Sequence, residues 1–282
     1  MENGILLINK NVGVTSRSVD NALGKMFHTH RVGHLGTLDP FASGLLVVAI
    51  NKGTKFLPFL TDSPKLYSAK LVLGEATSTG DTEGATIIKK DVPSLNQQMI
   101  KDVFDSFLGD SFQIPPMTSA IKVNGTALYE LAHQGKEVER KKRAIHIDSL
   151  DLISFHGNQI EFLTRVSTGT YIRVLGEDIA LKLGTVGHLT SLKRLSIGNF
   201  SLENASAIEN IDQNSIFDPT PFITCFPHYE IDDIKVKWVK DGKRLTLPSN
   251  YGERVLLTYE QKAIAVYQKE NDLTYVSVRG LF

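Results

Sequence analysis

One carboxylate, Asp39, stands in the glycine-rich stretch RVGHLGTLDPFASGLLVV, residues 31–48. Glycine lets the backbone approach a substrate closely, and a carboxylate in such a loop can act as a nucleophile or stabilise positive charge. The plainer interpretation is a turn in which Asp39, followed by Pro40, accepts a hydrogen bond from a nearby backbone N–H. The loop alone leaves both interpretations open.

Two tyrosines and an arginine could complete such a site. Tyr67 begins a strand-like segment, YSAKLVLG, and the segment STGTYIR carries Tyr171 and Arg173 two residues apart. If GTYIR ends a strand, that spacing puts both side chains on one face of a sheet. An arginine beside Asp39 would keep the carboxylate ionised, while a tyrosine can stack on a base or transfer a proton. Aromatic residues in strands are also typical of the core, so the chemistry requires these segments to meet.

Several common classes of site have no motif in the sequence. There is no dinucleotide fingerprint, P-loop, G-x-S-x-G elbow, H-E-x-x-H or C-x-x-C. The one cysteine, Cys225, excludes an intramolecular disulfide and an all-cysteine metal site. We therefore expect chemistry that uses neither a cofactor nor a metal.

Composition indicates an ordinary globular protein. The 282 residues are 41% hydrophobic and 22% charged, which fits one large domain or a main domain with a small one. The N-terminal residues lack the pattern of a signal peptide, and no stretch approaches the ~18 apolar residues of a membrane helix. We expect a soluble cytoplasmic protein without a membrane partner.

The overall charge argues mildly against a nucleic-acid-binding protein. The 31 basic residues balance the 31 acidic residues, whereas such proteins often have a pI above ~9. The exception is the local run Arg140, Lys141, Lys142 and Arg143, preceded by Lys136. This run is either a solvated turn or a local RNA-binding patch.

The remaining pattern indicates mixed strands and helices without a strict βαβ order. Helices are expected after Thr15 or Ser16, across Thr54 to Leu60 and after Ser94, where apolar residues recur at helical spacing. A further helix is expected at 174–184, and strands at 5–9, 44–50, 67–74, 160–166 and 190–200. After residues 218–222, four short alternating runs predict a small β-rich module: 234–238, 254–259, 262–268 and 273–279.

Six motifs follow one another along the chain: NKNVGVTS (9–16), GHLGTLDPFASGLL (33–46), KLY with LGEATSTGDTEG (65–67 and 73–84), QIPPMTSAIKVNGTALYELAHQG (113–135), GTYIRVL (169–175) and HLTSLKRLSIG (188–198). In this order they resemble the TruB family, the bacterial tRNA pseudouridine(55) synthases. Asn9 and Asn11 replace the family's usual Asp and Pro in the first motif, which is expected to relax that turn without affecting the chemistry.

The resemblance implies a fold and a domain organisation. The expected class is α+β, with a mixed, largely antiparallel central sheet of the pseudouridine synthase fold and flanking helices. Residues 1–222 would form the catalytic domain, with an RNA-binding insertion at about 112–145. Residues 223–282 would form a small PUA-like RNA-binding domain, the alternative being an unrelated small barrel.

The resemblance also implies an activity: conversion of one uridine in the T-loop of tRNA to pseudouridine, with the nucleotide flipped out of its loop. The partner would be the tRNA T-arm, alone or together with the acceptor stem, and no obligate protein partner is expected. An RNA-folding chaperone with little chemistry and an enzyme acting on small nucleotides are the alternatives. The implied roles are Asp39 as the catalytic aspartate, Arg173 as its ion-pair partner, Tyr67 stacking on uracil and a candidate to move a proton, Tyr171 and Leu192 lining the pocket, His34 entering the T-loop, Lys10 near the site, and Arg140, Lys141, Lys142 and Arg143 binding RNA.

Overall fold

The computed structural model describes residues 3–119, 121–123 and 125–281. Its main sheet is mixed and largely antiparallel, because only β3 and β12 pair in parallel, so the expected α+β class is confirmed. β2 (Val32–Leu35) adds to β3, and β13 (Phe200–Ser201) adds to β12. The strand order is β1 (Gly4–Lys10), β3 (Ser43–Ile50), β12 (Gly187–Ile197), β4 (Lys65–Leu73), β11 (Gln159–Val166), β10 (Arg143–His156) and β7 (Gly109–Gln113).

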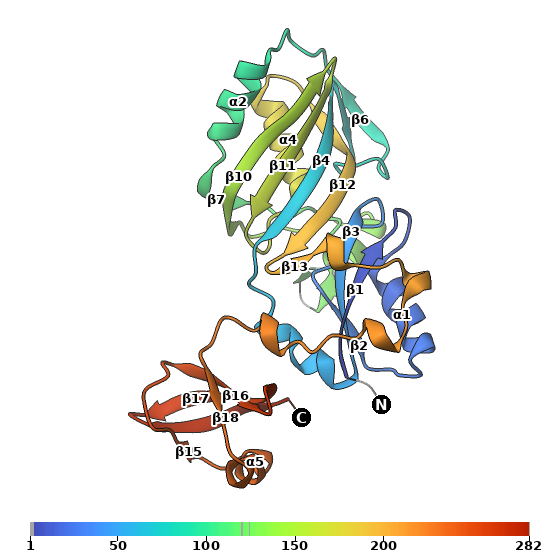
Figure 1. The fold of residues 1–282 in the computed structure, drawn as a ribbon. Helices are drawn as coiled ribbons and strands as arrows, with labels where there is room; N and C mark the ends of the chain where they lie inside the picture. Colours follow the sequence, from blue (N-terminus) through green and yellow to red (C-terminus); the bar gives the residue numbers. More distant parts are fainter. Residues whose placement is uncertain (1–2, 120, 124, 282) are drawn as a thin grey trace.

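Two helices, α2 (Gln97–Asp105) and α4 (Ile172–Lys182), cover one face of the sheet around β10, β11, β4 and β12 (Figure 1). Phe104 of α2 packs edge-on against Phe162 of β11 in this core. Helix α2 begins two residues later than predicted: Asn96, not Ser94, caps it by accepting a hydrogen bond from the Met99 N–H at 2.9 Å.

A second helix layer supports the strands around Asp39. Helix α1 (Ser16–Met26) begins after Thr15, whose hydroxyl accepts a hydrogen bond from the Ser18 N–H, as one of the two predicted caps. Its residues Val19 and Leu23 pack on β1 and β3. The helix expected at 54–60 is instead two short 3₁₀ turns, η1 (Asn51–Lys55) and η2 (Leu57–Phe59).

The smaller elements lie at the periphery. The hairpins are β5 (Glu75–Thr77) with β6 (Thr86–Lys89) and β8 (Lys122–Val123) with β9 (Thr126–Ala127), the latter followed by α3 (Leu128–His133). Short 3₁₀ turns occupy the segment before the second sheet: η3 (Leu202–Asn204), η4 (Ile208–Asn210), η5 (Gln213–Ser215) and η6 (Thr220–Phe222).

The C-terminal residues form a separate five-stranded sheet with α5 (Asp233–Lys240) beside it (Figure 1). Three predicted strands are present, but the one predicted at 234–238 is wrong, because these residues belong to α5. Asp232 caps the helix, and Val236 and Val239 pack inward at helical spacing. The strand order is β14 (His228–Glu230), β16 (Arg254–Tyr259), β17 (Lys262–Asn271), β18 (Thr274–Gly280) and β15 (Leu245–Thr246).

The two sheets share a hydrophobic core. Phe59 packs edge-on against Phe226 with ring centroids 5.7 Å apart, and the Ala263 N–H donates to the Thr220 hydroxyl. The Phe59–Phe226 contact attaches the C-terminal part of the chain to the segment just before β4, and the Ala263–Thr220 bond ties β17 to η6. Among the described residues, no helix is long and apolar enough to cross a membrane.

Candidate active site

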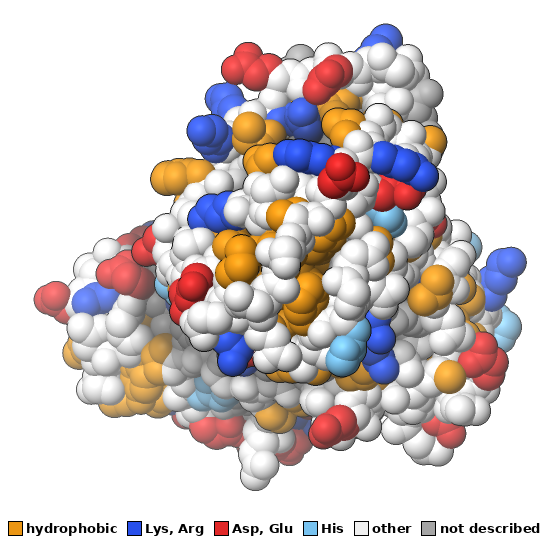
Figure 2. Space-filling model, turned by 90° about the horizontal axis from the view of Figure 1, so that it is seen from above, with side chains coloured by type: hydrophobic (Ala, Val, Ile, Leu, Met, Phe, Trp, Pro, Cys, Tyr) orange, Lys and Arg blue, Asp and Glu red, His pale blue; other side chains and the backbone are white. Residues whose placement is uncertain are grey.

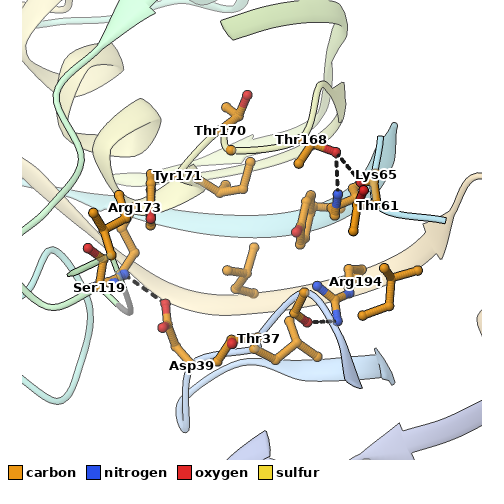
Figure 3. A pocket seen from close by; sticks show the side chains of 18 residues that line it. Thr37, Asp39, Thr61, Lys65, Ser119, Thr168, Thr170, Tyr171, Arg173 and Arg194 are labelled. Carbon is orange, nitrogen blue, oxygen red and sulfur yellow. Dashed lines mark hydrogen bonds and ion pairs between the residues drawn. The ribbon is translucent and has the colours of Figure 1, made fainter. Parts of the chain in front are cut away.

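A cavity of about 390 Å³ opens between the β2–β3 loop, the turn before α4, the first residues of β4 and the second half of β12 (Figure 3). Its floor comes from two neighbouring antiparallel strands: Lys65 and Tyr67 of β4, and Leu192 and Arg194 of β12. Members of each pair are two residues apart and so share a face, and Tyr67 lies directly opposite Arg194. The volume is in the range of pockets that hold small ligands.

The Asp39 loop is held firmly at both ends. The Ser16 hydroxyl of α1 donates to the Leu38 carbonyl and accepts from the Leu38 N–H, at 3.0 and 2.9 Å. Gly44, the second residue of β3, has a φ of +99° and lies so close to β12 that an added Cβ would be 2.3 Å from the carbonyl oxygen of Arg194. The glycine therefore serves a close backbone contact, and the loop presents Asp39 in a fixed position.

Arg173 reaches Asp39 from the first turn of α4. Its Nε lies 2.9 Å from Asp39 Oδ2 (Figure 3). The other guanidinium nitrogens donate to the Thr79 carbonyl and to the hydroxyl and carbonyl of Thr118, at 2.6–2.9 Å. A second carboxylate, Asp81, lies 3.6 Å from Nη1. Arg173 is thus buried and fixed, with Nε left to face Asp39.

Burial and charge act on Asp39 in opposite directions. Burial raises the pKa of the Asp39 carboxyl above its usual value, and the Asp81 charge adds to this rise. The charges of Arg173 and Lys10 oppose it. Burial also lowers the pKa of Lys10 to about 8, and its ammonium donates to the Val14 carbonyl at 2.6 Å. Lys10 therefore acts on Asp39 through its charge while its hydrogen bonds hold the turn after β1.

Tyr171 and Arg173 reach the cavity by a different route from the one predicted. The prediction that they share a strand face is wrong, because β11 ends at Val166 and Ile172 begins α4. Gly169, at φ +90°, turns the chain between them. Both side chains still line the cavity, since α4 begins at its wall.

A side-chain amide fixes the start of α4. The Tyr171 N–H donates to Gln113 Oε1 at 2.7 Å, and Gln113 Nε2 donates back to the Tyr171 carbonyl at 3.1 Å. Burial raises the pKa of the Tyr171 phenol. β7, which carries Gln113, thus links the cavity to Arg143, its partner in the β10 register.

The remaining predicted site residues lie outside the cavity lining. His34 contacts Asp20 Oδ2 through Nδ1 at 2.9 Å and Thr37 Oγ1 through Nε2 at 3.2 Å. In the basic run, Arg140 donates to the Pro115 carbonyl, and Lys141 and Lys142 help to line a separate hollow. The structure thus brings Asp39, Tyr67, Tyr171, Arg173 and Leu192 together, and leaves His34, Lys10 and the basic run around them.

Sequence reasoning did not single out Lys65 and Arg194. Lys65 precedes Tyr67 by two residues and Arg194 follows Leu192 by two, so the period of a strand already places each beside a predicted site residue. Thr37, Ser119 and Thr168 carried no comparable signal. Across the described residues, no group of three or more His, Cys, Asp or Glu is arranged to hold a metal ion.

Comparison with known proteins places the chain in a family. Residues 24–172 match the model of the TruB family pseudouridylate synthase N-terminal domain. The tRNA pseudouridine synthase B of Hydrogenovibrio crunogenus is 44% identical over 211 residues, covering 75% of this chain and 70% of that protein. The protein of the same name from Streptococcus agalactiae is 35% identical over 289 residues, covering 99% and 97%.

The fold also matches that of a chain in the crystal structure of a Cbf5–Nop10–Gar1 complex. The two are 22% identical with a TM-score of 0.76, over 99% of this chain and 85% of the other. The fold is therefore the expected pseudouridine synthase fold. On the family model, the close relatives and this fold together, the chain belongs to the TruB family of pseudouridylate synthases.

Proposed function

We propose that this protein converts one uridine in the T-loop of tRNA to pseudouridine, with Asp39 as the catalytic carboxylate. The observation that carries the proposal is the Asp39–Arg173 ion pair at the wall of a cavity floored by Tyr67 and Leu192. The relatives named tRNA pseudouridine synthase B support the substrate. A tRNA substrate also implies a cytoplasmic location.

The reaction breaks the bond between ribose C1′ and uracil N1, turns the base and joins C1′ to C5. The proton on C5 leaves and N1 regains one, so no atom or electron is imported and no cofactor or metal is required. Asp39 assists departure of the base, as a nucleophile or by stabilising positive charge on the sugar. Tyr67 and Leu192 confine the detached base, and the Tyr67 phenol is a candidate to move the proton.

The target nucleotide must leave its folded loop to enter the cavity, which costs a few kcal/mol of unstacking. We assign the compensating contacts to the insertion at 112–145 and to His34, which would occupy the vacated space in the T-loop. The insertion combines the basic run with Phe112, whose side chain is 73% exposed, and exposed aromatic residues can stack on bases. Its contact with the T-arm is supported by its link to the cavity through Gln113.

The C-terminal residues 223–282 form, on this proposal, a PUA-like domain that extends the contact toward the acceptor stem. Basic side chains of α5, such as Lys237 and Lys240, are exposed there. On the face shown in Figure 2, Lys and Arg side chains alternate with Asp and Glu, in keeping with the zero net charge. Attraction of RNA then depends on local groups, with the overall charge contributing little.

The test is tritium release from unmodified tRNA labelled at uracil C5, followed by mapping of pseudouridine. Purified protein is expected to release label from one T-loop uridine, and Asp39→Asn is expected to bind the tRNA without turnover. Asp91→Asn, at an exposed position away from the cavity, is the matched control and keeps the wild-type rate. A wild-type rate in Asp39→Asn would show that Asp39 is not catalytic. Turnover of free uridine or UMP would favour an enzyme of small nucleotides.

A further inference from the structure

Two buried cations line the cavity at the end away from Asp39 and Arg173 (Figure 3). Lys65 is 8% exposed and Arg194 is 1% exposed. In the described part of the chain, neither forms an ion pair with a carboxylate, whereas Arg173, the third cation of the cavity lining, pairs with Asp39. A buried charge without a counter-charge is costly, so this arrangement favours negative charge in the ligand.

The hydrogen bonds of Lys65 leave it able to bind a ligand. Its Nζ donates to Thr168 Oγ1 at 2.8 Å and to the Ser63 carbonyl at 3.2 Å. An ammonium has three donors, and no other described residue accepts the third. Burial and the Arg194 charge lower the pKa of Lys65 to about 8, with the Asp62 charge opposing them.

Arg194 has a structural task in addition to its charge. Its Nε donates to the Leu45 carbonyl and Nη2 to the Gly36 carbonyl, both at 2.8 Å. These bonds tie β12 to the two ends of the Asp39 loop. The two bonds use two of the five N–H donors of the guanidinium, and Nη1 has no hydrogen-bond partner among the described residues. Lys65 and Arg194 therefore both have donors to offer, and Arg194 adds a fixed positive charge beside Lys65.

The position of Lys65 in the cavity indicates which part of a flipped nucleotide would come near its ammonium. The base enters first, while the phosphates remain on the RNA chain at the mouth. Lys65 adjoins Tyr67, on which the uracil would stack, and Asp39 at the other end would face the sugar. The group that reaches Lys65 is then an edge of the base, which carries the carbonyl oxygens O2 and O4.

We propose that Lys65 donates a hydrogen bond to a carbonyl oxygen of the target uracil and, with the charge of Arg194, stabilises the base after its glycosidic bond breaks. The inference rests on the proposed function. When C1′–N1 breaks, the electron pair stays on N1 and delocalises onto O2 and O4, leaving the sugar carbon to be stabilised by Asp39. The pair forms the new bond when C5 joins C1′; the C5 proton then leaves to a base and N1 gains a proton, so the base is neutral again. Lys65 is thus a further catalytic residue, aimed at the leaving group.

The experiment compares three proteins on three RNAs under single-turnover conditions. The proteins are wild type, Lys65→Met and Lys70→Met, the last being in the same strand with its side chain on the opposite, exposed face. The RNAs are T-arm hairpins carrying uridine, 2-thiouridine or 4-thiouridine at the target position. Sulfur accepts hydrogen bonds more weakly than oxygen and delocalises negative charge better. A thio substitution at the oxygen that Lys65 contacts should therefore make the reaction rate depend less on Lys65.

With uridine, Lys65→Met is expected to lower the rate of the chemical step by about 100-fold, the typical loss for one such donor, with Kd for the RNA changed less than about threefold. With one of the thio bases, the ratio of wild-type to Lys65→Met rates is expected to fall markedly. Lys70→Met is expected to match wild type on all three RNAs. A structural role for Lys65 would lower all three rates by the same factor.

Equal ratios for the three bases, or a loss confined to Kd, would overturn the inference. If Lys65→Met does not unfold cooperatively on heating, the variant is misfolded and the rates of the wild-type protein on the three RNAs decide. Equal wild-type rates on the three RNAs overturn the inference. A lower wild-type rate on one of the two thio-substituted RNAs supports it. Absence of any wild-type turnover of the uridine hairpin would instead contradict the proposed function.

Discussion

Asp39 Oδ2 and Arg173 Nε lie 2.9 Å apart, one in a loop between strands and the other in the first turn of a helix far along the chain. Every nitrogen of the guanidinium other than Nε has a hydrogen-bond partner in Thr79 or Thr118. The arginine therefore has one orientation, and the Asp39 carboxylate is placed by a partner that cannot turn away. This relationship controls how much of the carboxyl is ionised.

Arg173→Lys is expected to shift the acid limb of the pH–rate profile, where activity is lost as pH falls, to higher pH. Burial raises the pKa of Asp39 and the Arg173 charge opposes that rise, so a more distant lysine charge leaves the carboxyl protonated at pH values where wild type is ionised. The measurement is single-turnover rate against pH. Arg165→Lys, on β11 and paired with Asp148, is the control with an unshifted limb. An unchanged limb in Arg173→Lys would show that the arginine does not set the ionisation of Asp39.

The strands of the site could be predicted because their pattern is local. In β4 every second residue from Lys65 to Leu73 is buried, and the sequence alternates in the same way. The strand predicted at 67–74 therefore agrees with the observed bounds to within two residues. The same period puts Lys65 and Tyr67 on one face of β4, so it could have placed Lys65 beside Tyr67. Motifs of the family then brought Asp39, Tyr67 and Arg173 together, which periodicity alone does not do.

Other features depend on contacts that a local pattern does not contain. GTYIR looks like the end of a strand, but the left-handed turn at Gly169 and the bonds from Gln113 start a helix there. Likewise, 234–238 alternates like a strand, yet the packing of Val239 against the second sheet selects α5, in agreement with the local cap at Asp232. Tertiary contacts override weak local preference in both segments.

Gly44→Ala is expected to destabilise the fold by several kcal/mol. A Cβ at this position would meet the Arg194 carbonyl at 2.3 Å, and the residue also has a left-handed φ of +99°. Gly109→Ala is the matched control, since its φ of +88° is close to that of Gly44 and nothing lies within 4 Å of the added Cβ, and it should cost about 1–2 kcal/mol. Urea unfolding measures both. Equal losses would show that β3 and β12 can separate at Gly44 without penalty.

Lys65→Met is expected to change how stability depends on pH. Because the pKa of Lys65 is lowered from its usual 10.5 to about 8, the folded state binds this proton less tightly than the unfolded state. The charged lysine therefore destabilises the fold below pH 8, by on the order of 3 kcal/mol, and this penalty disappears as pH rises to 10.5.

The measurement is urea unfolding of wild type and Lys65→Met at several pH values from 7.5 to 10.5. Relative to the variant, wild type should gain stability across that range. Lys70→Met removes an exposed ammonium on the other face of β4 and should keep a constant difference from wild type. A constant difference for Lys65→Met as well would mean that its ammonium is not desolvated in the folded protein.

The affinity for tRNA is expected to fall steeply with salt, in spite of the zero net charge, because local lysines and arginines displace counterions from phosphates. Lys141→Ala and Lys142→Ala should each weaken binding and each reduce the slope of log Kd against log salt by about one. These residues line the hollow in the insertion and form no ion pair within the described residues, so their charges are available to RNA.

Lys101→Ala, on the exposed side of α2, is the control and should leave the slope of log Kd against log salt unchanged. A flat salt dependence of the wild type, or identical slopes for all four proteins, would leave shape and stacking as the source of affinity and remove the basic run from the RNA interface.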